Sequence, residues 1–457
     1  MRKIFLSLFC CLALSFCLVA QQNSGDSHEG HDHSGHDHSG HDHSGHDHSS
    51  HDHSGHDHGS HDGSHSAHTN NITAPCGSAA QVIHHEGYDP SATAIHHISD
   101  ANVFTIMDMV RIPLPMIIYN KDRGMEFFMS SKFSAGHHDD GHHGYKDYVM
   151  MHGNIHRLKC PGFADQESYE VAGFDVQKNK DAAGKEYETP YAIIGGKAYE
   201  IEQKTIWDGG LLGGGITSFY DLSPTKNVVS MILVCLLFFY LFRKAAKAYA
   251  NREGQAPSGI QSFLEPVVQF IRDDVAIPFI GEGKYERFFP LLLTIFVFIL
   301  GLNLWGQVPF LGSVNVTGSL TVTAVLAIIV FLISNFNGNK HYWQHIFNMP
   351  GVPWFVKIIL TPVELLGMFI KPLTLMLRLA GNISAGHIAI LSFVGLIFIF
   401  GNAGQSTAGS ITGVVMAIPL TIFMMAIELI VAFVQAFVFT LLAASYIGAA
   451  IEDHDHH

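Results

Sequence analysis

The chain has 457 residues, of which 47% are hydrophobic and only 14% are charged, with a formal net charge of −14 at pH 7. This composition is too apolar and too poor in charge for an ordinary soluble enzyme of this length, and it indicates an integral membrane protein. The negative charge gives no sign of nucleic-acid binding, and no glycine-rich phosphate-binding motif stands at a strand-to-helix junction. We therefore expect a chain that binds neither nucleic acid nor nucleotide and uses no cofactor.

The first twenty residues have the pattern of an export signal. The basic start Met1-Arg2-Lys3 is followed by an apolar run from Ile4 to Ala20 and then by polar Gln21. This pattern predicts a secretory signal peptide over residues 1–20. The segment that follows is then expected outside the cytoplasm.

A histidine-rich tract occupies residues 21–70 and repeats a pentapeptide of the form Gly-His-Asp-His-Ser. It has almost no apolar residue to bury, so we expect it to be disordered. Imidazole beside carboxylate suits Zn or Ni. Two interpretations remain open, a solvated spacer and weak Zn or Ni binding at positions such as His31, His33, His36 and His38.

Residues 71–221 predict a small β-rich domain outside the cytoplasm. Two strands are expected at Arg111–Tyr119 and Met125–Met129 around a turn, and a further strand at Tyr145–Met151. A disulfide between Cys76 and Cys160 is open, since export would favour it. A further loop is interpreted as a solvated turn rather than a metal site. It contains His137, His138, Asp139, Asp140, His142 and His143.

Residues 222–457 predict the membrane domain. Apolar runs suited to crossing a bilayer extend over Asn227–Phe242, Phe288–Pro309, Thr317–Phe336, Trp354–Phe400 and Ile411–Ile451. The last two exceed the roughly 20 residues that a perpendicular helix needs, so they must tilt or bend. Gln261–Ile277 mixes apolar and charged residues and predicts an amphipathic helix at the interface. The expected fold class is an all-α polytopic membrane protein with about five transmembrane helices and a small extracytoplasmic β-rich domain.

Basic residues indicate the orientation of these spans. Arg243, Lys244 and Lys247 follow the first span and Lys340 follows the third, whereas the loops 311–316 and 401–409 carry no Lys or Arg. By the positive-inside rule the basic loops are cytoplasmic. This places the β-rich domain in the periplasm and the C-terminus in the cytoplasm of a bacterial inner membrane protein, in agreement with the signal peptide.

A one-sided polar stripe runs through the long apolar segment. A spacing of seven residues separates Glu364, Lys371 and Arg378, and Asn382 follows one turn later. In the last apolar segment the same spacing separates Glu428 and Gln435. Arginine keeps its charge at every accessible pH, which costs about 3 kcal/mol or more inside a bilayer. Mutual pairing in a helical bundle would explain the stripe, but Leu and Ala would serve stability better. Ion conduction is the favoured interpretation.

The most specific motif is Lys371-Pro-Leu-Thr-Leu-Met-Leu-Arg378-Leu-Ala-Gly-Asn382, supported by Gln435-Ala-Phe437 and Phe289-Pro-Leu-Leu-Leu-Thr294. From near Thr225 to Gly448 the chain resembles subunit a of the F-type ATP synthase, the membrane stator subunit. Ala380 departs mildly from the phenylalanine that is common in the family at that position. The β-rich domain and the histidine-rich tract are extra to the family pattern.

The resemblance implies a proton-conducting subunit that is not catalytic alone and that contacts a rotor c-ring, peripheral-stalk b subunits and lipid. It implies two half-channels that protonate and deprotonate the rotor carboxylates, with Arg378 between them. Glu364 and Asn382 match polar residues near this arginine, and Gln435 matches the glutamine that faces it. His387 and Glu428 match a pair whose residue types are exchanged in other members, which implies that they cooperate. By the derived orientation, Glu364 belongs to the cytoplasmic half-channel and His387 with Glu428 to the periplasmic one.

Two other classes compete with this interpretation. A metal-ion transporter with a zinc-capturing histidine-rich arm would need intramembrane ligand pairs one turn apart, yet Leu391 stands four residues after His387. A purely structural anchor for the exported domain leaves the charged stripe unexplained. The residues leave open whether H⁺ or Na⁺ is the coupling ion, the size of the rotor ring and the favoured direction of operation.

Overall fold

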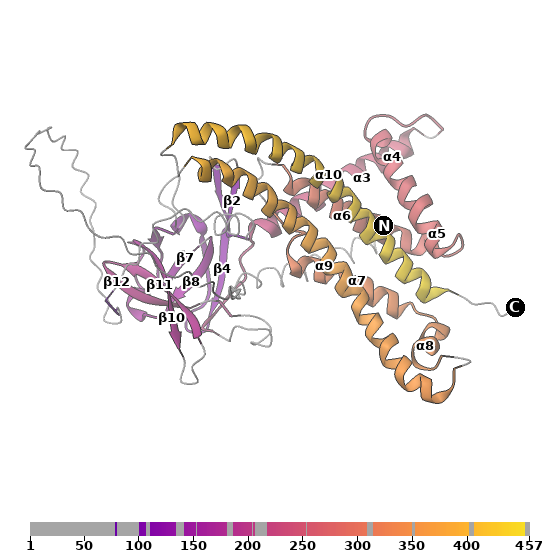
Figure 1. Ribbon diagram of the computed structural model, residues 1–457, viewed down its shortest axis with the longest axis horizontal. Coiled ribbons are helices and arrows are strands. Elements are labelled where there is room, and N and C mark those ends of the chain that lie inside the picture. Colours follow the sequence, from indigo (N-terminus) through magenta and orange to yellow (C-terminus); the bar gives the residue numbers. More distant parts are fainter. Residues whose placement is uncertain are drawn as a thin grey trace, which may run out of the picture.

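The computed structural model describes residues 78–79 and 100–452, apart from 107–109, 134–140, 152, 181–185, 203, 206–216, 253, 309–313, 350–351 and 402–405. A β-rich domain lies at one end of a helical bundle, away from the end that holds α5 and α8 (Figure 1). The predicted signal peptide, the histidine-rich tract and the segment His137–Asp140 fall outside the described residues. Predictions for those segments therefore stay predictions.

The β-rich domain consists of short antiparallel strands and two 3-10 turns. In chain order these are β1 (Ser78–Ala79), β2 (Val103–Ile106), β3 (Val110–Pro113), β4 (Pro115–Asn120), β5 (Gly124–Met129), η1 (Ser130–Phe133), β6 (His143–Gly144), β7 (Tyr148–Met151), β8 (Asn154–Leu158), η2 (Pro161–Phe163), β9 (Tyr169–Glu170), β10 (Gly173–Lys180), β11 (Glu186–Ile194), β12 (Lys197–Glu202) and β13 (Phe219–Asp221). The largest sheet has the order β10-β11-β12-β8-β7, with β1 paired to β12, and a second sheet has the order β13-β4-β5.

Two apolar clusters hold this domain together. One packs the larger sheet against the turn η2 and contains Val149, Leu158, Phe163, Tyr199 and Ile201. The other joins the two sheets, because buried side chains of β4, β7, β8 and β13 meet there, namely Met116, Ile118, Tyr148, Met150, Ile155 and Phe219. Cys160 is disulfide-bonded, and its partner lies outside the described residues.

The predicted strands differ from the observed ones at two places. Arg111–Tyr119 is split into β3 and β4, which belong to different sheets. Pro113 and Pro115 flank the break, and proline has no N–H with which to continue a hydrogen-bond ladder. The strand predicted at Tyr145–Met151 begins only at Tyr148, because Lys146 adopts a φ of 54° and turns the chain.

The membrane domain is helical. Its elements are α3 (Lys226–Asn251), α4 (Ile260–Phe270), the π-helical η3 (Ile271–Ala276), α5 (Ile277–Ile280), α6 (Tyr285–Gly306), α7 (Leu320–Phe336), α8 (Lys340–Phe347), α9 (Trp354–Phe400) and α10 (Thr407–Ile451). Among the described helices, α3, α6, α9 and α10 are long and apolar enough to cross a membrane, and α7 with α8 forms a pair bent by 103° that could supply a fifth span. The predicted fold class is confirmed.

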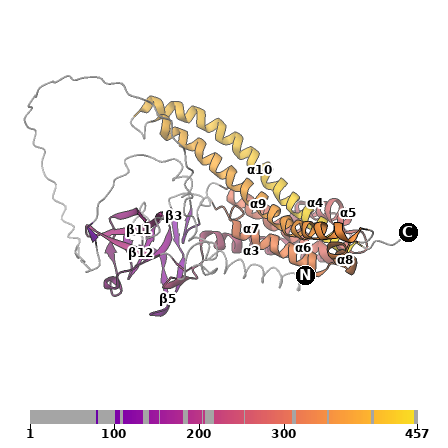
Figure 2. The ribbon, with the colours of Figure 1, turned by 60° about the horizontal axis from the view of Figure 1, so that its bottom comes forward.

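Helices α9 and α10 form a long antiparallel hairpin that leans across the other helices (Figures 1 and 2). They contain 47 and 45 residues. At 1.5 Å per residue each is about 70 Å long, more than twice the thickness of a bilayer core. Strong tilt is therefore required, as the apolar lengths predicted.

The segment predicted as an amphipathic helix at Gln261–Ile277 is helical from Ile260 to Ile280 through α4, η3 and α5. Its apolar side joins the main core of the bundle, in which Ile271 and Val275 cluster with Ile447 and Ile451 of α10. Gly448 allows this contact, because a Cβ atom there would collide with the carbonyl group of Phe279. The C-terminal end of α10 is thereby fixed to the segment.

The β-rich domain is joined to the helical bundle by an apolar cluster. Phe104 and Leu114 of the domain cluster with Val228 and Met231 at the start of α3 and with Val314 of the loop before α7. Asp100 Oδ1 also accepts a hydrogen bond from the backbone N–H of Asn227 at 3.2 Å. These contacts attach the domain directly to the membrane helices.

Candidate functional site in the membrane domain

The site is formed between α9 and α10, whose close contact depends on small residues. A Cβ atom at Gly413 would lie 2.8 Å from the Cα atom of Ile397, and one at Gly386 would lie 3.0 Å from Oε1 of Glu428. Ala417 and Ala432 of α10 are also buried. Small residues let the backbones of membrane helices approach closely. Polar side chains on the two helices are thus brought within reach of each other.

His387 of α9 and Glu428 of α10 meet in this contact. The distance between His387 Nε2 and Glu428 Oε1 is 3.6 Å, and the side chains are only 13% and 3% exposed. Within the described part of the chain, Glu428 Oε1 is buried and accepts no hydrogen bond. Imidazole and carboxylate can both take up and release protons. The pair is therefore chemically suited to passing a proton within a buried environment.

Asn303 of α6 supports this contact, although the sequence pattern did not mark it. Asn303 donates a hydrogen bond to the carbonyl oxygen of Ala432 at 3.1 Å, and it accepts one from Thr317 at 2.6 Å. A buried asparagine in an otherwise apolar span is costly unless it is hydrogen-bonded. That rule alone would have marked Asn303 as a residue of interest.

A second set of polar contacts lies one turn before His387. Ser384 donates a hydrogen bond to the carbonyl oxygen of Gly318 at 3.2 Å, and Asn315 donates to Ser384 Oγ at 3.4 Å. Asn315 Oδ1 also accepts a hydrogen bond from the N–H of Gly318 at 3.0 Å. The loop before α7 is thereby held against α9 beside the His387 contact. Sequence patterns gave no indication of this, because the loop meets α9 only through the fold.

Arg378 occupies the middle of α9. Its side chain is exposed, and it forms no hydrogen bond or ion pair with another described residue. Asn382 and Lys371 are exposed on the same helix, whereas Glu364 is half-buried. Gln435 of α10 is buried, with 7% of its surface exposed, and no hydrogen bond joins it to Arg378. A permanent charge on an apolar helix is thus left without an ion pair among the described residues.

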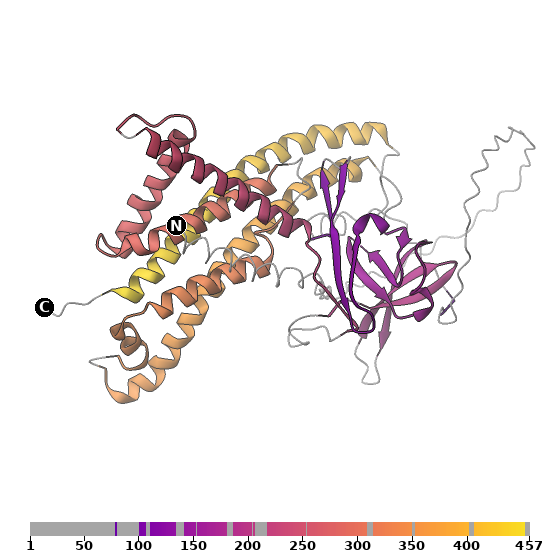
Figure 3. The same ribbon diagram turned by 180° about the vertical axis from the view of Figure 1, so that it is seen from behind.

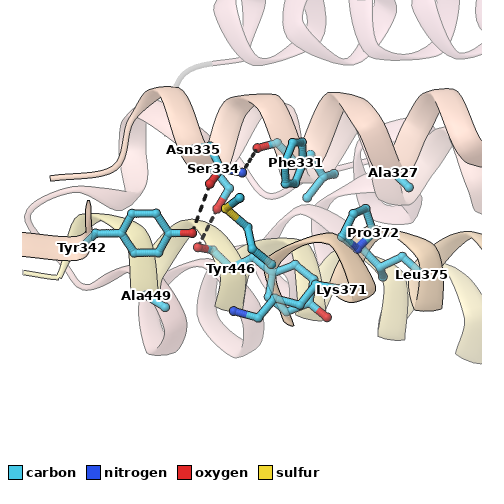
Figure 4. A pocket seen from close by; sticks show the side chains of 12 residues that line it. Ala327, Phe331, Ser334, Asn335, Tyr342, Lys371, Pro372, Leu375, Tyr446 and Ala449 are labelled. Atoms are coloured by element: carbon cyan, nitrogen blue, oxygen red, sulfur yellow. Dashed lines mark hydrogen bonds between the residues drawn. The ribbon is translucent and has the colours of Figure 1, made fainter. Parts of the chain in front are cut away.

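A small cavity lies between α7, α8, α9 and α10 on the Lys371 side of Arg378 (Figure 4). Its volume is about 20 Å³, which is room for one water molecule. Tyr342 donates a hydrogen bond to Asn335 Oδ1 at 3.1 Å at this cavity. Lys371 Nζ lies 5.4 Å from the ring centroid of Tyr446, within range of a cation–π contact. The cavity is lined by Ala327, Val330, Phe331, Ser334, Asn335, Tyr342, Met368, Lys371, Pro372, Leu375, Tyr446 and Ala449.

The predicted charged stripe passes near this cavity. The charge of Arg378 lies within electrostatic range of Tyr446, and that of Glu364 lies within range of Tyr342. Along a straight helix Glu364 lies about 21 Å from Arg378 on the cavity side, and His387 lies about 13 Å away on the other side. Two separate polar regions therefore flank the arginine. No group of three or more His, Cys, Asp or Glu residues that could hold a metal ion occurs in the described part of the chain.

Comparison with known proteins assigns the membrane domain. The family profile described as "ATP synthase A chain" matches residues 228–448, and a profile for a domain of unknown function matches residues 93–183. The chain is 41% identical to "ATP synthase subunit a 2" of Chlorobaculum tepidum over 52% of this chain and 66% of that protein. It is 42% identical to "ATP synthase subunit a" of Chloroherpeton thalassium over 52% of this chain and 69% of that protein.

A third relative matches more of the chain. "ATP synthase subunit a" of an Anaeromyxobacter species is 34% identical over 327 residues, which cover 69% of this chain and 73% of that protein. A match of that length is longer than the range of the membrane-domain profile. The chain belongs to the ATP synthase A chain family.

Proposed function

We propose that this chain is the proton-conducting stator subunit of a rotary F-type ATP synthase. In this proposal two half-channels let protons reach and leave the carboxylates of a rotor c-ring, and Arg378 separates the half-channels. The observation that carries the proposal is the guanidinium in the middle of an apolar helix, which is exposed, has no ion pair among the described residues and is flanked by two polar regions. The family membership supports it independently.

Electrostatics gives the arginine its role. An ionised carboxylate is costly in lipid, so a rotor carboxylate must be protonated before it turns out of the stator. Beside Arg378 the carboxylate is stable in its ionised form, because an opposite charge lies close to it. Arginine does not release its own proton, so it repels a proton that approaches from either side and does not carry it across. Protons then cross only when the rotor turns.

The two flanking regions are the proposed paths. His387 and Glu428 form the path on the side of the β-rich domain, with Asn303 and Ser384 holding the surrounding backbone. Glu364 and the cavity beside Lys371 belong to the other path. The positive-inside pattern assigns the first path to the periplasm and the second to the cytoplasm. Asn382 and Gln435 are proposed to line the space around Arg378.

The partners follow from the exposed surfaces. The side of α9 that carries Arg378 and Asn382 is proposed to face the c-ring, and peripheral-stalk b subunits are proposed to hold the chain against it. The membrane potential supplies about 2.3 kcal/mol per proton for each 100 mV. A rotor that couples this energy to ATP synthesis needs a stator charge that stays fixed, which Arg378 provides.

The test is ATP-driven proton pumping by the assembled complex in vesicles. Arg378→Ala should abolish pumping and permit passive leak, because the barrier between the paths is removed. Arg378→Lys should also fail to pump normally, since lysine releases its proton more readily and does not form the same planar contacts. Ser392→Ala, which removes an exposed hydroxyl of α9 outside the Arg378 motif, is the control and should pump. Normal coupled pumping by Arg378→Ala would refute the proposal.

A further inference from the structure

Exposed apolar side chains of the β-rich domain are concentrated on one small sheet. Among the described residues before α3, the large hydrophobic side chains that are exposed are Ile112, Tyr119, Met125, Phe127, Met129 and Val176. Four of these belong to β4 and β5, and Ile112 lies just before them on β3. Phe127 is 69% exposed and Met125 is 49% exposed. Large apolar side chains that cluster on an exposed surface usually mark a contact with another protein or with a membrane.

Strand register places the four side chains on one face. Tyr119 of β4 pairs with Met125 of β5, and Phe127 and Met129 follow at intervals of two, which is the period of one strand face. Tyr220 of β13 pairs with Tyr119, and the two ring centroids are 6.2 Å apart. We name this surface, formed by Tyr119, Met125, Phe127, Met129 and Tyr220, the apolar sheet face.

The position of the sheet decides where this face points. Its opposite face is buried, because Met116 and Ile118 cluster with Tyr148 and Ile155 of β7 and β8. β4 lies nearer the helical bundle than β7 and β8 do, in the front view and in the view from behind (Figures 1 and 3). The apolar sheet face is therefore turned toward the bundle side of the domain and away from its own core.

The small sheet is also connected by a short segment to α3, the first long apolar helix. β13 ends at Asp221 and α3 begins at Lys226, so the connection spans at most about 18 Å. Leu222 donates a backbone hydrogen bond to Ile117 at 2.8 Å, which keeps this connection against β4. On α3 the exposed apolar residues begin at Ile232, where lipid contact is expected. The sheet that carries the apolar sheet face is thus held close to the start of the first long apolar helix.

We propose that the apolar sheet face rests on the bilayer surface beside the helical bundle, with Phe127 and Met125 inserted at the boundary between headgroups and acyl chains. Tyr119 and Tyr220 have an apolar ring and a polar hydroxyl, as is typical of side chains at a membrane interface. Lys121, exposed in the turn between β4 and β5, has the length to reach lipid phosphates. The β-rich domain would then act as a second membrane contact that limits tilting of the stator.

Lipid is favoured over another protein because the apolar sheet face continues the exposed apolar side of α3. The exposed side of α3 and the apolar sheet face are joined by a short, hydrogen-bonded connection, and both are apolar on the outside. A second copy of this chain would instead have to fit on the side of the domain that is nearer its own helical bundle. The experiment below separates these occupants.

The test uses a fluorescent probe on single cysteines in the full chain, within the assembled complex. Phe127→Cys carries an environment-sensitive label, and Val176→Cys on β10, which is 48% exposed, is the matched control. Cys235 is replaced by Ser, and the labelling of that parent protein is subtracted. The complexes are reconstituted into phosphatidylcholine and phosphatidylglycerol vesicles whose acyl chains are either brominated or plain.

If the proposal holds, brominated chains should quench the label at position 127 roughly twofold or more relative to position 176, and its emission should shift to shorter wavelength. Met129→Cys, on the same face, should behave like Phe127→Cys. Strong quenching at position 127 by aqueous iodide, equal to that at position 176, would overturn the proposal. Shielding from both iodide and brominated lipid would also overturn it, in favour of a protein occupant.

Discussion

His387 Nε2 and Glu428 Oε1 lie 3.6 Å apart across the contact between α9 and α10. The two residues are 41 positions apart in sequence and come together only because both long helices fold back along each other. The distance is slightly too long for a direct hydrogen bond, yet a small shift or one bridging water would complete a path for a proton. The proposed periplasmic path can therefore be tested by substituting these two residues.

The first prediction concerns coupling within that pair. His387→Ala and Glu428→Ala should each lower ATP-driven proton pumping roughly tenfold or more, because each removes a proton-carrying group. The double variant should lose little beyond the worse single variant, since both residues serve one path. Pumping rates of the assembled complexes in vesicles measure this.

A swapped pair gives a sharper check of the same idea. His387→Glu combined with Glu428→His restores one imidazole and one carboxylate at the contact, so it should recover much of the rate lost in the single variants. Ser392→Ala, which removes an exposed hydroxyl bonded only within α9, is the control and should leave pumping near normal. Strictly additive losses with no recovery in the swap would show that the two residues act separately.

The second prediction concerns the attachment of α10 to the interfacial segment. Gly448→Val should destabilise the complex by about 1–3 kcal/mol, because the new side chain would overlap the backbone of Phe279. Gly367→Ala is the matched control, since a Cβ there meets nothing within 4 Å. Thermal unfolding of the purified complex should separate the two variants, and equal stability would contradict the packing described.

The third prediction concerns a buried ion pair in the β-rich domain. Lys204 Nζ lies 3.2 Å from Asp221 Oδ2, and the side chains are 3% and 0% exposed. Lys204→Met should cost about 3–5 kcal/mol, because it leaves Asp221 with an uncompensated buried charge. Adding Asp221→Asn should recover much of that loss, since it removes the charge and keeps the acceptor for the N–H of Ser223.

Hydrogen exchange of β13 and β4 in the full chain measures this third prediction. The single variant should exchange much faster than the parent protein, and the double variant should lie between them. If Lys204→Met exchanged at the parental rate, the pair would contribute nothing to holding the domain.

The fourth prediction is a pH dependence in the small sheet. Burial alone would raise the pKa of Glu126, but hydrogen bonds from Lys146 and Tyr148 and the charge of Arg123 outweigh it and lower the pKa below its ordinary value of 4.5. A carboxyl whose folded pKa is lowered stabilises the fold above its unfolded pKa. This stability is lost as the pH falls below 4.5 through the lowered folded value.

Protection of β5 against hydrogen exchange should therefore fall in acid in the parent protein. Glu126→Gln should reduce protection at neutral pH and flatten the dependence below pH 4.5. The exposed Glu200 on β12 is the matched position, and Glu200→Gln should leave the acid profile of β5 unchanged. An unchanged profile in Glu126→Gln would mean that another group controls the sheet.

The sequence by itself determined the class of the protein and much of its membrane architecture. Long apolar runs predicted α9 at Trp354–Phe400 with the observed bounds, and their excess length required tilt. The motif around Arg378 led to the family that the comparisons then established. These features are local, because hydrophobicity, helix length and a short motif are properties of neighbouring residues.

Only the tertiary structure decided which distant residues meet. It brought His387 to Glu428, placed Asn303 and Ser384 beside them, and left Arg378 without an ion pair among the described residues. It also turned the apolar side of β4 and β5 outward. Such relationships depend on helix crossings, strand register and small residues at close contacts, which are set by packing over the whole chain and are not encoded in any single segment.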